Sequence, residues 1–309
     1  MRNEQTTSRP DLSVSIAGVP LKNPVMTASG TFGSGREYAE FFDLSRLGAV
    51  VVKGVSYEAW KGNPPPRIAE TYGGMLNSIG LHNPGVHHFI KEEIPFLRQF
   101  DTKIIVNVFG HTVEDYVKVT QELAGADVDM LELNISCPNV SKGGIIFGTD
   151  CVMVETVVSA VKKHARQPLI VKLSPNVTDI AAIAKAAENG GADALSLINT
   201  LLGMRIDINR RKPILQRKVG GLSGPAIKPV AVRMVWQVAN AVALPVIGMG
   251  GIMNGEDAIE FIMAGATGVA IGTASFHNPM AAMDVLEGIE AFMKRQNIGG
   301  LEEIRGIVK

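Results

Sequence analysis

A cysteine that follows an apolar strand is the first candidate for chemistry in this sequence. Residues 130–133 predict a buried strand that leads into Asn134-Ile135-Ser136-Cys137-Pro138-Asn139 and then into the glycine-rich stretch 141–148. A free cysteine is most often a small buried hydrophobe. Pro138 and the polar loop after it argue against simple packing here, so Cys137 is well placed for thiol chemistry on a loop able to open and close.

Two lysines each end an apolar strand. Lys53 follows three valines, and Lys172 follows Ile170-Val171. Burying an unpaired ammonium group is costly, so each lysine must reach solvent or meet an anion. We expect that anion to be a ligand. A lysine that snorkels to solvent is one alternative, and a Schiff-base nucleophile of the aldolase kind at Lys172 is another.

Amide side chains also gather at strand ends. Asn107, Asn134 and Asn199 each end a predicted strand, and Thr200 follows the last of them. A single asparagine at such a place is more often a cap or turn residue. Three on one rim suit a flat heterocycle whose edge alternates C=O and N–H groups. Residues 77–81 add further amide and backbone donors.

Glycines end the last two predicted strands. Gly248-Met249-Gly250-Gly251 and Gly272-Thr273 each lead toward a helix start. Glycines let backbone N–H groups approach a phosphate closely, and a helix N-terminus adds positive potential. Glycines that merely turn the chain are the alternative. Their joint presence at these two strand ends favours a phosphate site.

The elements that must position these residues are parallel strands with crossover helices. Short apolar runs rich in β-branched residues alternate with helix-length amphipathic segments, which is typical of such folds. The runs are 24–29, 49–53, 103–108, 130–134, 169–173, 194–199, 245–249 and 269–272. These eight units predict an α/β fold, a closed (β/α)8 TIM barrel whose active site lies at the carboxyl ends of its strands.

Local signals add detail to this barrel. Residues 14–16 and 19–21 predict an N-terminal hairpin that plugs the amino end of the barrel. Residues 204–208 and 214–215 predict extra short strands in the loop after strand six. The long connections after strands two, four and six decorate a single face. No linker or repeat is present, so residues 1–309 are expected to form one domain.

Helix signals complete the pattern. Thr178-Asp179 is expected to open a helix over 180–188, and a helix over 258–264 should follow Asn254. A third helix is expected over 151–164. Cys151, inside that helix, fits the role of a small buried hydrophobe.

Composition excludes several classes of protein. The chain holds 30 Lys+Arg and 30 Asp+Glu, so no global field favours nucleic acid or an anionic membrane. Two cysteines are too few for a disulfide framework, a zinc site or an iron–sulfur cluster, and the histidines have no metal-binding spacing, so no metal is expected. Residues 1–11 lack a signal-peptide core, and no run approaches the ~20 apolar residues of a membrane span. We expect a cytoplasmic protein.

From about residue 12 to 293 the sequence resembles the dihydroorotate dehydrogenase family, and most of all its class 1B form. The motifs that carry the resemblance are 28–33, 62–67, 75–81, 134–140, 172–176, 198–201, 220–225 and 248–251. The resemblance implies FMN bound across the barrel mouth. The implied FMN-binding residues are Ser29, Lys53, Gly54, Asn107, Asn134, Lys172, Ile198, Gly224, Gly250, Gly251, Gly272 and Thr273. Lys172 would stand beside flavin N1 and stabilise negative charge on the reduced ring.

The same resemblance implies oxidation of dihydroorotate to orotate in de novo pyrimidine biosynthesis. The implied substrate-binding residues are Lys53, Asn77, Ser78, Ile79, Gly80, Leu81, Asn134, Asn199 and Thr200. Lys53 and the backbone donors of 77–81 would hold the substrate carboxylate. Cys137 would take the C5 proton as the hydride leaves C6 for flavin N5, with the 138–148 loop closed over the site.

Class 1B enzymes pass electrons to NAD through a partner subunit that carries FAD and a [2Fe-2S] cluster, typically in a heterotetramer of two chains of each kind. Residues 141–148 and 203–205 look like that class. A class 1A fumarate-dependent homodimer is the closest alternative, whereas class 2 enzymes use serine as the base and carry an apolar N-terminal extension. A cofactor-free aldolase or isomerase using Lys172, and a noncatalytic FMN- or phosphate-binding barrel, stay open as further hypotheses.

Overall fold

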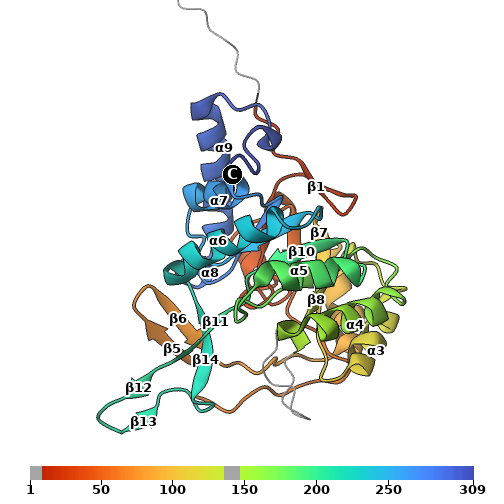
Figure 1. Cartoon of the computed structure of the whole chain (residues 1–309), viewed down its shortest axis with the longest axis vertical. Coiled ribbons are helices and arrows are strands. Elements are labelled where there is room, and N and C mark those ends of the chain that lie inside the picture. The colour runs from red at the N-terminus through yellow and green to blue at the C-terminus, as the bar shows by residue number, and fades with distance from the viewer. Residues whose placement is uncertain (1–8, 136–146) are drawn as a thin grey trace, which may run out of the picture.

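The computed structural model describes residues 9–135 and 147–309, and its centre is a closed barrel of parallel strands (Figure 1). Around the barrel the strand order is β10-β15-β16-β3-β4-β7-β8-β9. The bounds are β3 Val25–Thr27, β4 Ala49–Val51, β7 Lys103–Val108, β8 Met130–Asn134, β9 Leu169–Lys172, β10 Ala194–Leu197, β15 Val246–Met249 and β16 Gly268–Ile271. Each strand lies on one of the eight predicted apolar runs, which confirms the predicted TIM barrel.

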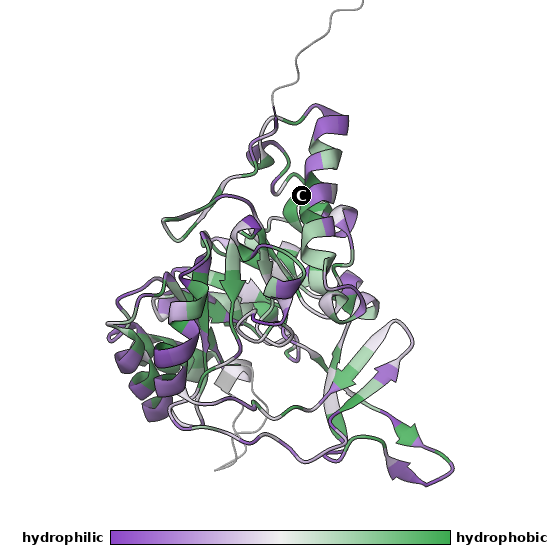
Figure 2. Cartoon of the chain, turned by 180° about the vertical axis from the view of Figure 1, so that it is seen from behind, coloured by the Kyte–Doolittle hydropathy of each residue, from purple (hydrophilic) through white to green (hydrophobic). Residues whose placement is uncertain are grey.

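The barrel strands are apolar throughout because both of their faces are covered. Side chains of β4, β8, β9 and β15 are buried at every position, and helices pack outside them. The helices are α1 Val86–His88, α2 Ile94–Leu97, α3 Val113–Leu123, α4 Cys151–Lys162, α5 Ile180–Asn189, α6 Lys228–Ala239, α7 Gly255–Met263, α8 Ala274–His277 and α9 Ala281–Gln296. Figure 2 shows their apolar sides turned toward the strands and their polar sides turned outward.

Helix starts follow the predicted capping residues. Asp179 Oδ1 accepts hydrogen bonds from the N–H groups of Ala181 and Ala182 and so fixes the start of α5. Helix α7 begins earlier than the predicted 258–264, because Asn254 and Asp257 form a capping box around its first turn.

The prediction that Cys151 is buried is wrong. Cys151 is exposed at the first position of α4, where Asp150 caps the helix. The buried stripe of this helix consists of Val154, Val157, Val158 and Val161, so it begins one turn after Cys151, which stands at the exposed N-terminal end of the helix.

Loops after strands two and six of the barrel build a separate antiparallel sheet, which we call the lobe. Its strand order is β11-β14-β6-β5. The bounds are β5 Ile68–Thr71, β6 Gly74–Asn77, β11 Leu201–Met204 and β14 Val219–Ser223. Figures 1 and 2 show the lobe standing out below the barrel, beside the carboxyl ends of its strands.

The predicted extra strand pair is confirmed with shifted bounds. Strand β12 (Ile206–Asp207) pairs with β13 (Lys212–Pro213) rather than with residues 214–215. Leu215 instead turns inward and packs on Ala69 and Leu76, since the lobe has a small core of its own. The β5–β6 hairpin and its pairing with β14 were not predicted.

The N-terminal hairpin lies at the amino end of the barrel, as predicted. Strand β1 (Val14–Ile16) pairs with β2 (Val19–Leu21), and Ile16 is fully buried. A Cβ placed at Gly268, the first residue of β16, would lie 3.1 Å from Ile16 Cδ1, so the hairpin covers the start of that strand.

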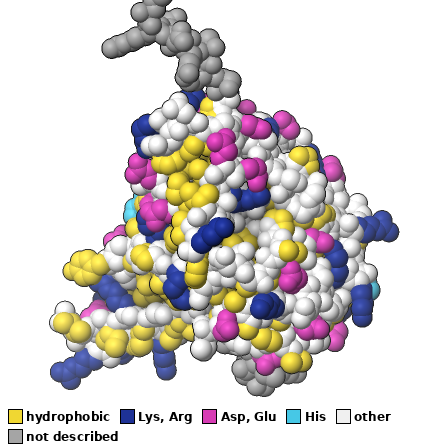
Figure 3. Space-filling model, turned by 45° about the horizontal axis from the view of Figure 1, so that its top comes forward, with side chains coloured by type: hydrophobic (Ala, Val, Ile, Leu, Met, Phe, Trp, Pro, Cys, Tyr) yellow, Lys and Arg dark blue, Asp and Glu magenta, His cyan; other side chains and the backbone are white. Residues whose placement is uncertain are grey.

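Short helical turns fill several connections. They are Tyr38–Glu40, Leu44–Arg46, Phe147–Thr149, Pro225–Ile227 and Leu301–Glu303, with a π-helical segment at Phe89–Glu93. Among the described residues, no helix is both long and apolar enough to cross a bilayer. Figure 3 shows acidic and basic side chains interspersed over the face in view, in keeping with the equal numbers of each in the sequence.

Candidate active site

A cavity of about 470 Å³ lies between the barrel mouth and the lobe. All nine residues predicted to bind substrate line it: Lys53, Asn77, Ser78, Ile79, Gly80, Leu81, Asn134, Asn199 and Thr200. We call this space the amide cavity. Its walls come from the ends of five barrel strands, β3, β4, β8, β9 and β10, and from the lobe, so residues more than a hundred positions apart in the chain meet there.

A smaller cavity of about 100 Å³ adjoins the amide cavity, and we call it the glycine pocket. Six of the predicted cofactor residues line it: Ile198, Gly224, Gly250, Gly251, Gly272 and Thr273. Gly30, Asn77, Asn199 and Thr200 line both cavities, so a ligand can extend from one into the other.

Backbone geometry requires glycine in this pocket. Gly250 and Gly251 have φ angles of +122° and +83°, which residues with side chains rarely adopt. A Cβ at Gly251 would lie 2.9 Å from the Gly224 carbonyl oxygen and 2.8 Å from Lys228 Cβ. Helix α8, after Thr273, is a single turn of four residues, so the pocket depends on backbone N–H groups more than on the helix dipole that the sequence predicted.

Hydroxyl groups add to the glycine pocket. Thr273 Oγ1 donates a hydrogen bond to Ser223 Oγ at 2.8 Å, and both side chains border the pocket. Ser223 was not predicted, because it precedes Gly224 at the end of a lobe strand that the sequence did not reveal.

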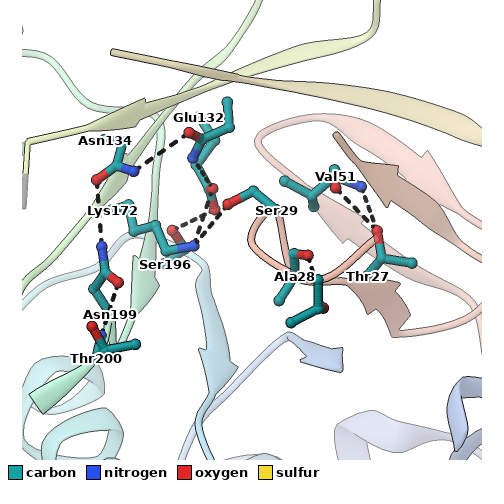
Figure 4. Close-up of polar contacts among 12 residues, drawn as sticks. Thr27, Ala28, Ser29, Val51, Glu132, Asn134, Lys172, Ser196, Asn199 and Thr200 are labelled. Atoms are coloured by element: carbon teal, nitrogen blue, oxygen red, sulfur yellow. Dashed lines mark hydrogen bonds and ion pairs between the residues drawn. The ribbon is translucent and has the colours of Figure 1, made fainter. Parts of the chain in front are cut away.

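Below the mouth lies a buried polar layer that contains Lys172 (Figure 4). Lys172 Nζ lies 3.4 Å from Glu132 Oε1 and donates to Ser29 Oγ at 3.3 Å. Asn107 Nδ2 donates to Glu132 Oε1 at 2.5 Å, and Ser196 Oγ donates to Glu132 Oε2 at 2.8 Å. The anion that meets Lys172 is therefore Glu132, and the expectation that this anion is a ligand is wrong for Lys172.

Lys53 has no such partner. Among residues 9–135 and 147–309, no carboxylate lies within ion-pair distance of its ammonium group. Burial and, after it, the charge of Lys172 hold the pKa of Lys53 below its ordinary value. Lys53 lines the amide cavity and a second pocket that also borders Gly54, so its charge remains available to a ligand.

The predicted asparagines form a chain of amides. Asn134 Nδ2 donates to Asn107 Oδ1 at 3.4 Å, and Asn199 Nδ2 donates to Asn134 Oδ1 at 3.4 Å. Tyr116 fixes the strand end from behind, since its hydroxyl donates to the Asn134 carbonyl at 2.8 Å. Asn134 and Asn199 border the amide cavity, whereas Asn107 is buried beneath them.

Three further residues shape the amide cavity and were missed by the sequence. Asn63 Nδ2 donates to the Ser78 carbonyl, and Arg217 Nε donates to Asn63 Oδ1, which ties segment 77–81 to the lobe. Asn176 Nδ2 donates to the Thr200 carbonyl. Asn63 and Asn176 stand within quoted motifs, so the motifs were their only signal.

Cys137, the predicted base, lies outside the described residues, as does most of the 138–148 loop. Within the described part of the chain, no group of three His, Cys, Asp or Glu side chains is placed to hold a metal ion.

The chain is similar to known proteins over nearly its whole length. The family model described as dihydroorotate dehydrogenase matches residues 11–293. The "Dihydroorotate dehydrogenase B (NAD(+)), catalytic subunit" of Alkaliphilus metalliredigens is 71% identical over 296 residues, which cover 96% of this chain and 98% of that protein. The protein of the same name from Lachnoclostridium phytofermentans is 64% identical over 96% of this chain and 99% of its own length.

Solved structures agree on the fold. A dihydroorotate dehydrogenase from Eimeria tenella, crystallised with ferulenol, superposes with a TM-score of 0.79 at 22% identity, over 99% of this chain and 90% of that one. At this identity the likeness concerns the barrel alone, whereas the family match rests on the sequence relatives and the family model. On that evidence, the chain belongs to the dihydroorotate dehydrogenase family.

Proposed function

We propose that this chain is the catalytic subunit of an NAD-linked dihydroorotate dehydrogenase, which oxidises dihydroorotate to orotate with the help of bound FMN. The observation that carries the proposal is the junction of two cavities, one lined by amides and by a lysine that has no carboxylate partner in the described chain, the other by glycines. The names of the close relatives support the same activity and the NAD-linked class. We also predict that residues 1–309 form a single domain and that the protein is cytoplasmic.

The residues present fit FMN. The positive φ angles and close backbone packing of Gly250 and Gly251 leave N–H groups and space where a phosphate can approach, and Gly224, Gly272 and Thr273 complete that wall. FMN, when bound, supplies the hydride acceptor of the reaction. Lys53, Gly54, Asn107, Asn134 and Lys172 would hold its ring.

The amide cavity fits an anionic pyrimidine. Lys53, with no carboxylate near it in the described chain, would meet the substrate carboxylate together with backbone N–H groups of 77–81. Asn77, Asn134, Asn199 and Thr200 present donors and acceptors to the cavity and would orient the ring edge.

Cys137 is proposed as the base that takes the C5 proton, a role that rests on the sequence. Only its thiolate form accepts a proton, and a thiol with an ordinary pKa of about 8.5 is mostly protonated at neutral pH. Reduction of the bound flavin by dihydroorotate should therefore accelerate as pH rises, until the thiol is fully ionised.

The partner is proposed to be an electron-transfer subunit with FAD and a [2Fe-2S] cluster, in a heterotetramer. The words "catalytic subunit" and "NAD(+)" in the relatives' names support a partner and the final acceptor. The two cysteines of this chain are too few to hold such a cluster, in keeping with a separate subunit. Fast fumarate reduction by the chain alone, with no partner copurifying, would instead assign it to the class 1A homodimers.

The proposal is tested on the purified chain. We expect a yellow protein that releases FMN on denaturation. Borohydride should not link this protein covalently to a carbonyl substrate. A colourless protein that borohydride links to a carbonyl substrate would favour the aldolase that uses Lys172.

Two cysteine variants test the base. Cys137→Ala should keep FMN and bind orotate but reduce the flavin at least about a hundredfold more slowly with dihydroorotate. Cys151→Ala, which removes the exposed thiol on α4, is the matched control and should react as the wild type does. Near-wild-type flavin reduction in Cys137→Ala would remove Cys137 from the mechanism.

A further inference from the structure

A buried carboxylate lies at the centre of the polar layer below the mouth. Glu132 on β8 is 1% exposed, and the groups around it come from three neighbouring strands, β7, β9 and β10. In the sheet register Asn107 stands opposite Glu132, and Ser196 stands opposite Lys172. Lys172 itself stands opposite Asn134, two residues beyond Glu132 on β8, and the four side chains meet through contacts to the Glu132 carboxylate. Figure 4 shows Glu132, Lys172 and Ser196 turned toward one another.

Both oxygens of Glu132 are engaged. Asn107 Nδ2 and Lys172 Nζ approach Oε1, at 2.5 and 3.4 Å, and Ser196 Oγ approaches Oε2 at 2.8 Å. An amide N–H donor and an ammonium group suit an ionised carboxylate, which can only accept. The arrangement is a buried ion pair held by two neutral donors.

Stability alone gives little reason for such a pair. The desolvation of two charges consumes most of their mutual attraction, and well-packed apolar residues in their place are often neutral or stabilising. A chemical role is the better explanation, because the pair lies directly against the residues of the amide cavity.

Lys172 keeps part of its electrostatic influence on the barrel mouth, although Glu132 is its partner. An ammonium group has three N–H donors, and the described residues accept two of them, at Ser29 Oγ and Glu132 Oε1. Its field reaches the amide cavity, since it contributes to the lowered pKa of Lys53. The net field of the pair, rather than that of Lys172 alone, acts on whatever ring lies above.

We infer that Glu132 is a positioning residue that holds Lys172 under the flavin and offsets its charge, and thereby sets the reduction potential of the bound flavin. This inference rests on the proposed function. A cation near N1 favours the reduced ring, so an uncompensated Lys172 would make the flavin a stronger oxidant and a poorer donor to the next carrier. Glu132 keeps the flavin able to pass its electrons on.

The test is the midpoint potential of the bound flavin in a set of charge variants of the FMN-loaded chain at neutral pH. Glu132→Gln should shift the midpoint potential in the positive direction by at least about 30 mV, which corresponds to about a tenfold change in the equilibrium constant of the two-electron reduction. Lys172→Met should shift it in the negative direction by a similar amount. The double variant Glu132→Gln/Lys172→Met carries neither charge, so its flavin midpoint potential should lie near the wild-type value.

A matched control separates charge from hydrogen bonding. Ser196→Ala removes a donor to Glu132 and leaves both charges. The midpoint potential of its flavin should therefore differ from the wild-type value by only a small fraction of the shift expected for Glu132→Gln. If Glu132→Gln fails to fold, the double variant, which buries no unpaired charge, carries the test together with Lys172→Met.

An unchanged or lowered potential in Glu132→Gln, or a double variant no closer to the wild type than Lys172→Met is, would overturn the inference. A role limited to structure would weaken FMN binding without moving the potential. A wild-type chain that binds no flavin would instead overturn the proposed function, so the two failures are distinguishable.

Discussion

Lys53 follows β4 and Lys172 ends β9 at the same barrel mouth, but the protein treats their charges in opposite ways. Lys172 is buried with Glu132 as its partner, whereas Lys53 has no carboxylate within ion-pair distance in the described chain. Burial and the charge of Lys172 lower the pKa of Lys53. One cation is therefore compensated within the described chain, and we propose that the other is compensated by the substrate.

This difference separates two tasks. A compensated lysine keeps a fixed field on a cofactor that stays bound through every turnover. An uncompensated lysine gives its full attraction to a substrate that must arrive and leave, because the free enzyme bears the cost of the unpaired charge. The following predictions test this contrast, from the largest expected effect to the smallest.

Removal of the compensated lysine should destabilise the protein most. Lys172→Met leaves Glu132 buried without its cation, which should lower the free energy of unfolding by about 3 kcal/mol or more. Urea denaturation of the flavin-free proteins measures this loss. The double variant Glu132→Gln/Lys172→Met should recover most of it, and an equal loss in the double variant would mean that the buried charge is not the cause.

Removal of the uncompensated lysine should weaken substrate binding instead. Lys53→Met should lower orotate affinity roughly 10- to 100-fold, since a hydrogen bond between charged groups contributes about 1.5–3 kcal/mol. Titration of the flavin spectrum with orotate measures the affinity. Lys61→Met, a nearby surface lysine outside the amide cavity, is the control, and equal losses in both variants would contradict a specific contact.

The same Lys53→Met variant should be more stable than the wild type without ligand, by about 1 kcal/mol at neutral pH. The lowered pKa means that the unfolded chain binds the proton more tightly than the folded chain. Stability of the wild type should therefore rise with pH between the folded-state and unfolded-state values for Lys53, and the advantage of the variant should shrink there. A variant less stable than the wild type at neutral pH would refute this account of Lys53.

The smallest effect concerns protons. An anion beside Lys53 raises its pKa again, so orotate binding should take up a fraction of a proton between the pKa values of Lys53 in the free and the bound protein, and almost none well below that range. Calorimetry in two buffers of different ionisation enthalpy measures the uptake. Lys53→Met should show none, and equal uptake in that variant would assign the proton to another group.

Much of the fold was predictable because its strands are buried on both faces. Such strands appear as apolar runs, and each of the eight runs became a barrel strand. The lobe was not predictable in the same way. Its strands are short, and the pairing of β6 with β14, which joins the two loops, is long-range, as between Asn77 and Gly221, which are 144 positions apart. No local pattern records such a pairing.

The candidate site shows a similar division. Lys53, Asn134, Asn199 and the glycines of 248–251 were recognisable because strand ends converge in a barrel. Glu132 was not, because it stands inside an apolar run and its partner Lys172 is 40 positions away. Its signal was present all the same, since a lone carboxylate in a buried strand needs a cation as much as a lone lysine needs an anion.

The most direct test of the whole account is anaerobic mixing of the FMN-loaded chain, without any partner, with dihydroorotate. We predict loss of the visible flavin absorbance and formation of one orotate per flavin, because on our proposal the glycine pocket and the amide cavity hold the flavin and the substrate side by side. Flavin absorbance that stays unchanged at saturating dihydroorotate would contradict the account.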